Sequence, residues 1–236
     1  MSRRPDTDPV IELRGVEKHY TMGEFTVKAL QKVNLKIYPG DYISILGPSG
    51  GGKSTMLNIL GCLDQPTIGE YFLSGSDVSQ LSDNDLSKVR GKELGFIFQS
   101  YNLIQQLTVV ENIEVPLYYQ GVSEKESREI AVELATKVGL GTRLDHRPNE
   151  LSGGQQQRVA IARALSCDPA VILADEATGN LDSKSGSDIL RIFDELNAEG
   201  KTLIMITHDE AMAERTPRVI RLKDGEVAFD TYDQPD

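Results

Sequence analysis

The chain has 236 residues, of which 39% are hydrophobic and 26% charged, and its formal net charge is −11 at pH 7. This length and composition are typical of a soluble globular protein with one large or two small domains. The acidic balance weighs against a nucleic-acid partner, because phosphate binding needs clustered Lys and Arg side chains. No apolar run approaches the ~18 residues that a membrane-spanning helix needs.

Residues 1–9 are charged and lack the apolar segment of a secretory signal, so we expect a flexible N-terminus there. Cys62 and Cys167 lie in apolar helical stretches, which favours buried small side chains over a disulfide or a metal site. His19 and His146 are interpreted as structural. A reducing cytosol fits this cysteine usage.

The first hundred residues contain short segments with the period-two alternation, or the continuous apolar character, of β-strands. The predicted strands are residues 10–20, 30–37, 42–46, 71–73 and 94–98. Helices are predicted over residues 53–63 and 83–90, and "PGD" at 39–41 predicts a turn.

Helical periodicity dominates from about residue 109 to residue 165. Ser123 followed by Glu126 predicts a capping box at the start of a helix. Further on, apolar strands at 170–176 and 202–209 flank an amphipathic helix that ends at Gly200.

The tail, residues 218–232, predicts a hairpin with "DG" at its turn. Strands interleaved with helices favour an α/β fold, with a helical insertion from roughly residue 100 to residue 165.

A glycine-rich loop, "GPSGGGKST", lies between the strand and the helix predicted on either side of it. It fits the phosphate-binding pattern G-x-x-x-x-G-K-[ST], in which glycines let backbone amides surround an anion. Lys53 can reach the β- and γ-phosphates, and the Ser54 hydroxyl can bind Mg²⁺. The predicted nucleotide-binding residues are Gly47, Pro48, Ser49, Gly50, Gly51, Gly52, Lys53, Ser54 and Thr55.

Polar residues follow several of the predicted strands. Asp175 and Glu176 end "VILADE", where open α/β sheets bind their ligands. Asp175 can hold Mg²⁺, and Glu176 is placed to polarise an attacking water. On its own this acidic pair could equally be a solvated turn; together with the glycine-rich loop it indicates phosphoryl chemistry.

Three more residues are candidates that their local sequence alone does not decide. His208 and Gln99 each follow a predicted strand, where most such residues are structural or simply exposed. Tyr20 is a strand-end aromatic residue that could stack on a base.

"LSGGQ", residues 151–155, precedes a second helical stretch. Ser152, Gly153 and Gly154 could start a helix whose amides face an anion, although this loop carries no lysine. The chain therefore contains two loops suited to phosphate.

In this order, the motifs resemble those of the ATP-binding subunit of ABC transporters, and the resemblance covers nearly the whole chain. Walker A corresponds to residues 47–55, the Q-loop to Gln99, the signature to "LSGGQ", Walker B to "VILADE", the D-loop to "GNLD" and the H-loop to His208. The wording of "STMLNILGCLDQPTIGE" and "FQSYNLIQQLTVVENIEVPL" resembles the LolD, MacB and FtsE branch, whose members serve lipoprotein release, macrolide and peptide export, or cell division.

The resemblance implies a P-loop NTPase core of the ABC type with an antiparallel β subdomain and a helical insertion. It implies one domain over residues 10–236, with the core and the β subdomain in 10–99 and 166–236 and a helical signature subdomain in 100–165.

The resemblance also implies ATP as the substrate and Mg²⁺ as the metal. Tyr20 would stack on adenine, and Ser54, Gln99 and Asp175 would contact Mg²⁺. Glu176 would be the catalytic base. The other implied catalytic residues are Lys53, Gln99 and His208.

The implied partners are a second copy of the chain and an integral membrane permease, with no nucleic acid. Ser152, Gly153, Gly154 and Gln155 would address ATP held by the second copy, and Asp182 would lie at the same interface. The groove between the Q-loop and the helical insertion would receive the permease, which we expect to be separately encoded. The chain would be cytoplasmic, on the inner face of the membrane.

Two residues depart from the family pattern: Ala177 stands where this branch usually has proline, and Gly51 replaces a more usual serine. Neither change removes a catalytic group. The alternative reading is a soluble ABC ATPase of DNA repair or translation. Such proteins usually carry long coiled-coil or zinc-bearing insertions, or two cassettes in tandem, and this sequence has neither feature.

Overall fold

The structure is a computed structural model that describes residues 7–23 and 25–233. The expectation of a flexible N-terminus over residues 1–9 rests mainly on residues 1–6, which lie outside the described part. The chain divides into two compact units, one made of residues 1–89 and 200–236 and the other of residues 90–199.

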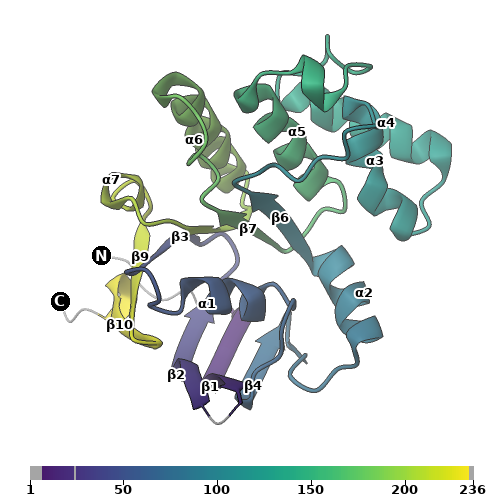
Figure 1. Ribbon diagram of the computed structural model, residues 1–236. Coiled ribbons are helices and arrows are strands. Elements are labelled where there is room, and N and C mark those ends of the chain that lie inside the picture. The colour runs from purple at the N-terminus through teal and green to yellow at the C-terminus, as the bar shows by residue number, and fades with distance from the viewer. Residues whose placement is uncertain (1–6, 24, 234–236) are drawn as a thin grey trace. The chain divides into compact units, whose positions relative to one another are not determined.

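The first unit contains an antiparallel sheet in the order β2-β1-β4-β5, and Figure 1 shows β2, β1 and β4 side by side. Its strands are β1 (Ile11–Met22), β2 (Phe25–Ile37), β4 (Ile68–Leu73) and β5 (Ser76–Asp77). β2 begins five residues earlier than predicted, because its exposed N-terminal half pairs with β1 as far as Met22 opposite Phe25. Phe25, Val27 and Ala29 alternate with polar residues, so this half of the strand carried a period-two signal that the prediction missed.

The first unit also contains three strands that pair in parallel. β3 (Tyr42–Leu46) pairs in parallel with β8 (Thr202–Ile206) and with β9 (Arg218–Lys223). Every residue of β3 and β8 is buried, which explains their continuous apolar sequences.

β9 returns antiparallel as β10 (Glu226–Asp230) through the predicted "DG" turn, where both turn residues have positive φ. The helical elements of this unit are α1 (Lys53–Leu60), α7 (Glu210–Ala213) and the 3₁₀ turn η2 (Thr231–Asp233).

The second unit pairs β6 (Leu94–Phe98) in parallel with β7 (Val171–Asp175). Three helices pack against one another in this unit, and a fourth packs against α5 (Figure 1). They are α3 (Val109–Tyr119), α4 (Glu124–Lys137), α5 (Gly153–Leu165) and α6 (Ser183–Ala198), with the 3₁₀ turn η1 (Pro148–Glu150) ahead of α5. α2 (Asp83–Glu93) runs from the first unit into the second.

Side-chain caps start the helices of the second unit. Thr108 and Glu111 form a complete capping box at α3, which the sequence analysis did not identify. The predicted box at α4 is present as its serine half, in which the Glu126 N–H donates to Ser123 Oγ over 3.4 Å.

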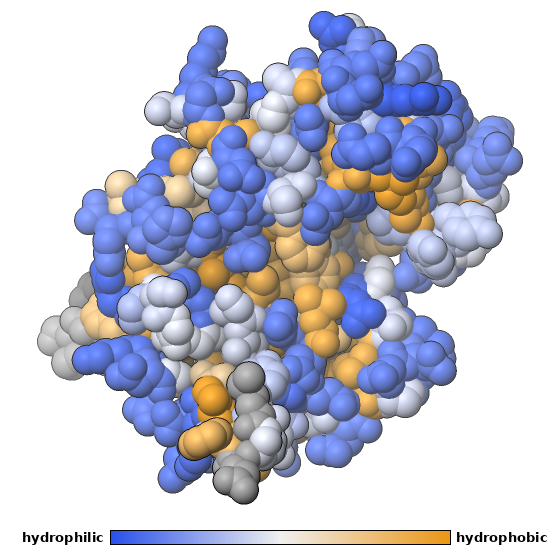
Figure 2. Space-filling model, viewed as in Figure 1, coloured by the Kyte–Doolittle hydropathy of each residue, from blue (hydrophilic) through white to orange (hydrophobic). Residues whose placement is uncertain are grey.

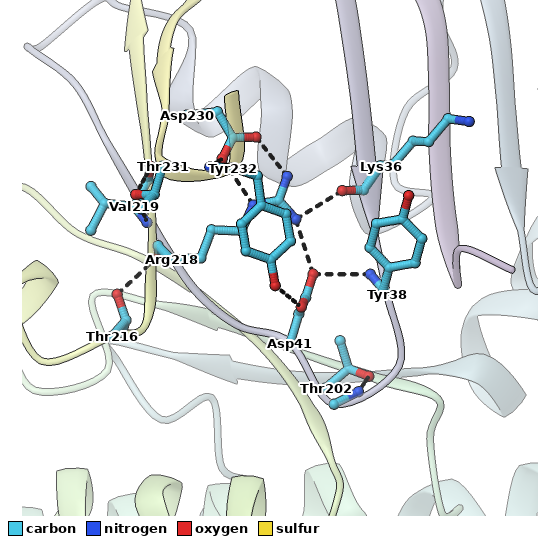
Figure 3. Close-up of polar contacts among 11 residues, drawn as sticks. Lys36, Tyr38, Asp41, Thr202, Thr216, Arg218, Val219, Asp230, Thr231 and Tyr232 are labelled. Atoms are coloured by element: carbon cyan, nitrogen blue, oxygen red, sulfur yellow. Dashed lines mark hydrogen bonds and ion pairs between the residues drawn. The ribbon is translucent and has the colours of Figure 1, made fainter. Parts of the chain in front are cut away.

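Within the first unit, a buried ionic cluster joins Arg218 of β9 to Asp230 of β10 and to Asp41, the residue before β3 (Figure 3). The Arg218 guanidinium donates to both carboxylate oxygens of Asp230, at 2.9 and 2.6 Å, and to Asp41 Oδ2 at 2.9 Å. It also donates to the Lys36 carbonyl at 2.8 Å and lies 4.1 Å from the centre of the Tyr232 ring. All three charged side chains are less than a tenth exposed.

The face seen in Figure 2 is largely hydrophilic, with hydrophobic side chains scattered over it. The most exposed large hydrophobic residues are Phe25, Tyr118 and Tyr119. Within the described residues, no helix has the length and apolar character needed to cross a bilayer. Both cysteines are described and neither is disulfide-bonded; Cys62 is buried as predicted, and Cys167 is half-buried.

Candidate active site

The loop between β3 and α1 is a tight backbone cradle. Gly50 and Gly52 have φ of +76° and +101°, in the region that favours glycine. A Cβ on Gly47 would lie 2.5 Å from the Leu222 carbonyl oxygen, and one on Gly52 would lie 2.8 Å from that of Ala29. Gly52 is therefore required both by its conformation and by the close approach of the Ala29 carbonyl. Gly47 is required by the close approach of the Leu222 carbonyl alone.

The lysine of the loop folds back over it. Lys53 Nζ donates to the carbonyl oxygens of Gly47 at 2.6 Å and of Pro48 at 2.9 Å. α1 begins at Lys53, and its N-cap residue, Gly52, supplies no side-chain acceptor to the first turn. Amides at the start of an uncapped helix and an adjacent ammonium group make a site for an anion.

Tyr20 is in the same unit as this cradle. Its hydroxyl donates to Asp64 Oδ2 over 2.9 Å, and Lys18 Nζ, 5.1 Å from the ring centre, bonds the other Asp64 oxygen. Burial and the Asp64 contact raise the pKa of Tyr20, while a hydrogen bond with the Thr55 side chain lowers it in part. Tyr20 thus meets the cradle at Thr55, and Asp64 is a partner that the sequence analysis missed.

His208 follows β8 in the first unit, two residues after the strand ends, and its side chain is exposed. The first unit therefore carries Tyr20, residues 47–55 and His208. The remaining predicted site residues are in the second unit.

The second unit carries the acidic pair and the Q-loop glutamine. Asp175 ends β7, and Glu176 adopts φ +45°, which is uncommon for a residue with a side chain. Gln99 is tied to the D-loop at Asn180: Gln99 Nε2 donates to Asn180 Oδ1 at 3.2 Å, and Asn180 Nδ2 donates to the Gln99 carbonyl at 3.1 Å. Asn180 is another residue that the sequence analysis missed.

The "LSGGQ" segment starts α5 through a capping box. The Gln155 N–H donates to Ser152 Oγ at 3.3 Å, and the Ser152 N–H donates to Gln155 Oε1 at 2.9 Å. Within the described residues, the Gly153 and Gly154 amides have no acceptor. A cavity of about 320 Å³ lies beside this helix start, with Ser152, Gly154 and Arg158 in its lining. The segment is therefore a helix start with two amides unpaired among the described residues, a feature that suits an anion.

The D-loop aspartate lies in the same unit as this helix start. Asp182 is the N-cap of α6 and accepts hydrogen bonds from the Lys184 and Ser185 amides at 3.0 Å. These bonds, led by that of the Ser185 backbone, lower the pKa of Asp182. The Ser185 hydroxyl also donates to Asp182, and a Cβ on Gly154 would lie 3.1 Å from that hydroxyl oxygen. The D-loop and the signature helix therefore lie side by side within one chain.

Comparison with known proteins decides the family. The sequence profile described as "ABC transporter" matches residues 30–179. The chain belongs to the ABC transporter family.

An ABC transporter ATP-binding protein of Thermotoga maritima is 53% identical over 218 residues, which are 92% of this chain and 93% of that protein. The macrolide export ATP-binding/permease protein MacB of Hyphomonas neptunium is 50% identical over 95% of this chain. That match takes in 35% of MacB, so the chain spans about a third of the length of the MacB relatives.

Solved structures agree. A dimeric structure of the ATP-binding cassette MJ0796 bound to ADP and Pi has a TM-score of 0.86 and 47% identity, covering 96% of this chain and all of that one. A second dimeric structure of MJ0796 has a TM-score of 0.85 and 48% identity.

These findings confirm the predicted α/β P-loop core of the ABC type and the MacB-like branch. The chain is an ATP-binding, ATP-hydrolysing cassette of the ABC transporter family. The alternative of a repair or translation ATPase is not favoured.

Proposed function

We propose that two copies of the chain pack head to tail, bind two ATP molecules between them and energise an integral membrane permease. The observation that carries this proposal is the contrast between the two loops. The cradle before α1 has a lysine and uncapped amides, whereas the "LSGGQ" loop at the start of α5 has amides and a serine but no cation of its own. Arg158, further along α5, bonds the Val138 carbonyl and pairs with Asp188. The second loop suits the completion of a site that another copy provides. The dimeric structures of MJ0796 support the pairing of two copies.

In this proposal Lys53 and the amides of residues 47–55 bind the phosphates, and Tyr20 stacks on adenine. Ser54, Gln99 and Asp175 would hold Mg²⁺, which when bound would neutralise negative charge on the β- and γ-phosphates.

Glu176 is the proposed general base, because a carboxylate at the end of a buried strand can orient and deprotonate a water. Gln99 and His208 orient the water and the γ-phosphate. Lys53 stabilises charge on the transferred phosphoryl group.

The signature loop acts on the other copy's nucleotide. The Gly153 and Gly154 amides point positive dipole ends toward an anion, and the Ser152 hydroxyl, whose oxygen accepts from Gln155, keeps its proton to donate. Gln155 fixes the loop through the capping box, and Asp182 lies at the same proposed interface.

The permease partner is proposed from the MacB relatives, whose name joins an ATP-binding part to a permease. The chain would then work at the inner face of the cell membrane. Its cargo, or a force-transmitting role, would belong to the permease.

Light scattering after gel filtration, with and without Mg²⁺ and ATP, tests the proposal. Glu176→Gln should bind ATP, lose hydrolysis and elute as a dimer, whereas Lys53→Ala should bind nucleotide weakly and stay monomeric. Glu129→Gln, on the exposed face of α4, is a matched control that should behave as the wild type. A Glu176→Gln protein that remains monomeric with ATP bound would contradict the shared site.

A further inference from the structure

Gln157 is a buried polar side chain of α5 that the proposed nucleotide contacts do not use. It is 0% exposed, and its Nε2 donates to the Ala177 carbonyl oxygen over 2.7 Å. Within the described residues, Gln157 Oε1 and Ser44 Oγ are the buried side-chain polar atoms without a hydrogen-bond partner. An unpaired buried oxygen lowers stability, so folding alone would favour an apolar side chain of the same size. A role for Gln157 must therefore lie in the backbone that its one hydrogen bond, to the Ala177 carbonyl, holds in place.

The bond holds the turn that follows β7. Glu176 has φ +45° there, and the Gly179 N–H donates to the Glu176 carbonyl at 2.9 Å. Gln157 takes the next carbonyl along the chain, that of Ala177, which is 2% exposed. A left-handed residue with a side chain persists only where its surroundings over-determine it. Two successive carbonyls, each tied from a different place, provide that restraint.

Alanine at 177 increases the need for this restraint. The family resemblance leads us to expect proline at this position, whose ring would fix φ. Alanine leaves φ open, so the restraint on this residue falls to the Gln157 hydrogen bond.

We infer that Gln157 is a positioning residue, which holds the turn carrying Glu176 from the signature helix. It acts on the backbone at Ala177 and not on the nucleotide. The orientation of the Glu176 carboxylate is thereby coupled to α5, the helix whose first amides are proposed to meet the other copy's ATP. The inference rests on the proposed role of Glu176 as the base.

Substitution of Gln157 by an apolar residue of similar size tests the inference. Gln157→Met removes the unpaired oxygen but leaves the buried Ala177 carbonyl without its donor, so the two effects on stability oppose each other and the melting temperature should stay close to that of the wild type. Its KM for ATP should stay within about twofold, while kcat should fall about tenfold, because small misplacement of a catalytic group is enough for such a loss. Gln157→Leu is measured in parallel, so that a folding defect of one variant is checked by the other. Ser44→Ala, which removes the other unpaired buried oxygen, is the matched control and should keep kcat.

Amide hydrogen exchange gives a readout independent of turnover. In the Gln157 variants, exchange should accelerate over residues 175–180 and stay unchanged over the rest of α5. Protection lost along the whole of α5, or a raised KM with unchanged kcat, would mean general packing and would overturn the inference.

Glu176→Gln, assayed beside these variants, separates the two claims. Wild-type turnover in Glu176→Gln would overturn the proposed base. An inactive Glu176→Gln together with wild-type turnover in both Gln157 variants would overturn the positioning role alone.

Discussion

Arg218→Met should unfold the protein at a much lower temperature, because it removes the one cation of a buried cluster. Arg218 is 4% exposed at its side chain and makes three hydrogen bonds to the carboxylates of Asp230 and Asp41, which are 6% and 7% exposed (Figure 3). Methionine fills a similar volume but leaves both acids buried without a countercharge. Breaking a buried pair from one side costs about 3–5 kcal/mol. In a domain of this size that corresponds to a fall in melting temperature of about 6–20 °C.

Differential scanning calorimetry at pH 7 measures this effect, and a double-mutant cycle isolates its cause. Asp230→Asn in the Arg218→Met background removes one uncompensated charge, so the double variant should be more stable than Arg218→Met alone. Arg218→Lys keeps the charge but loses the bidentate contact with Asp230. Its stability should therefore lie above that of both Arg218→Met variants and about 1–3 kcal/mol below that of the wild type. An Arg218→Met protein that melts within about 2 °C of the wild type would refute the reasoning.

Three further predictions concern pH and the nucleotide. Hydrogen bonds at the start of α3, chiefly that from the Thr108 backbone N–H, lower the pKa of Glu111 below 4.5. The ionised carboxylate therefore stabilises the fold above that pH, and this stabilisation is lost as the pH falls through the lowered pKa. The melting-temperature gap between wild type and Glu111→Gln should therefore be constant near neutral pH and narrow below about pH 4.5; a gap that widens in acid would contradict this. Gly47→Ala should abolish nucleotide binding or folding, because its new Cβ would lie 2.5 Å from the Leu222 carbonyl oxygen. Gly50→Ala has open space around the new Cβ but a φ of +76°, so it should lower the affinity for a fluorescent ATP analogue only about fivefold in a titration. In the same titration, Tyr20→Phe should bind within about twofold of the wild type and Tyr20→Ala about tenfold more weakly; equal losses would mean that the hydroxyl, and not the ring, matters.

The elements that the sequence predicted best are short apolar strands in which every residue is buried or half-buried. β6 was predicted with its observed bounds, and β3 likewise, because a short apolar run between polar residues leaves little choice of ends. The glycine-rich loop was predicted with the following helix for a similar reason, since conformation and close approach dictate glycine locally. The motif order then identified the family, which pairing and packing could not have done.

The hydrogen-bond partners of the buried polar side chains could not be predicted. Asn112 is fully buried in α3 at an apolar face, where its amide donates to the carbonyls of Ile104, Leu107 and Thr108 and accepts from the Ile104 N–H. A polar residue at a position with apolar periodicity was the one available signal. Arg218 and Asp41 are 177 positions apart, and nothing local to either indicates the other. Gln157 and Ala177 are a similar case within the second unit.

The two loops suited to phosphate, one before α1 and one at the start of α5, offer hydrogen-bond donors to an anion in different ways. At α1 glycine occupies the N-cap, so the first-turn amides are left for a ligand and Lys53 adds a full positive charge. At α5 the capping box uses the Gln155 amide, which leaves Gly153 and Gly154 as the anion-facing donors. Two amides in a loop that carries no cation of its own bind a phosphate too weakly to hold it alone. They can still strengthen the binding of a phosphate that another site already holds. An ATPase built this way should hydrolyse ATP efficiently only where two copies meet, so specific activity should rise with protein concentration at saturating ATP.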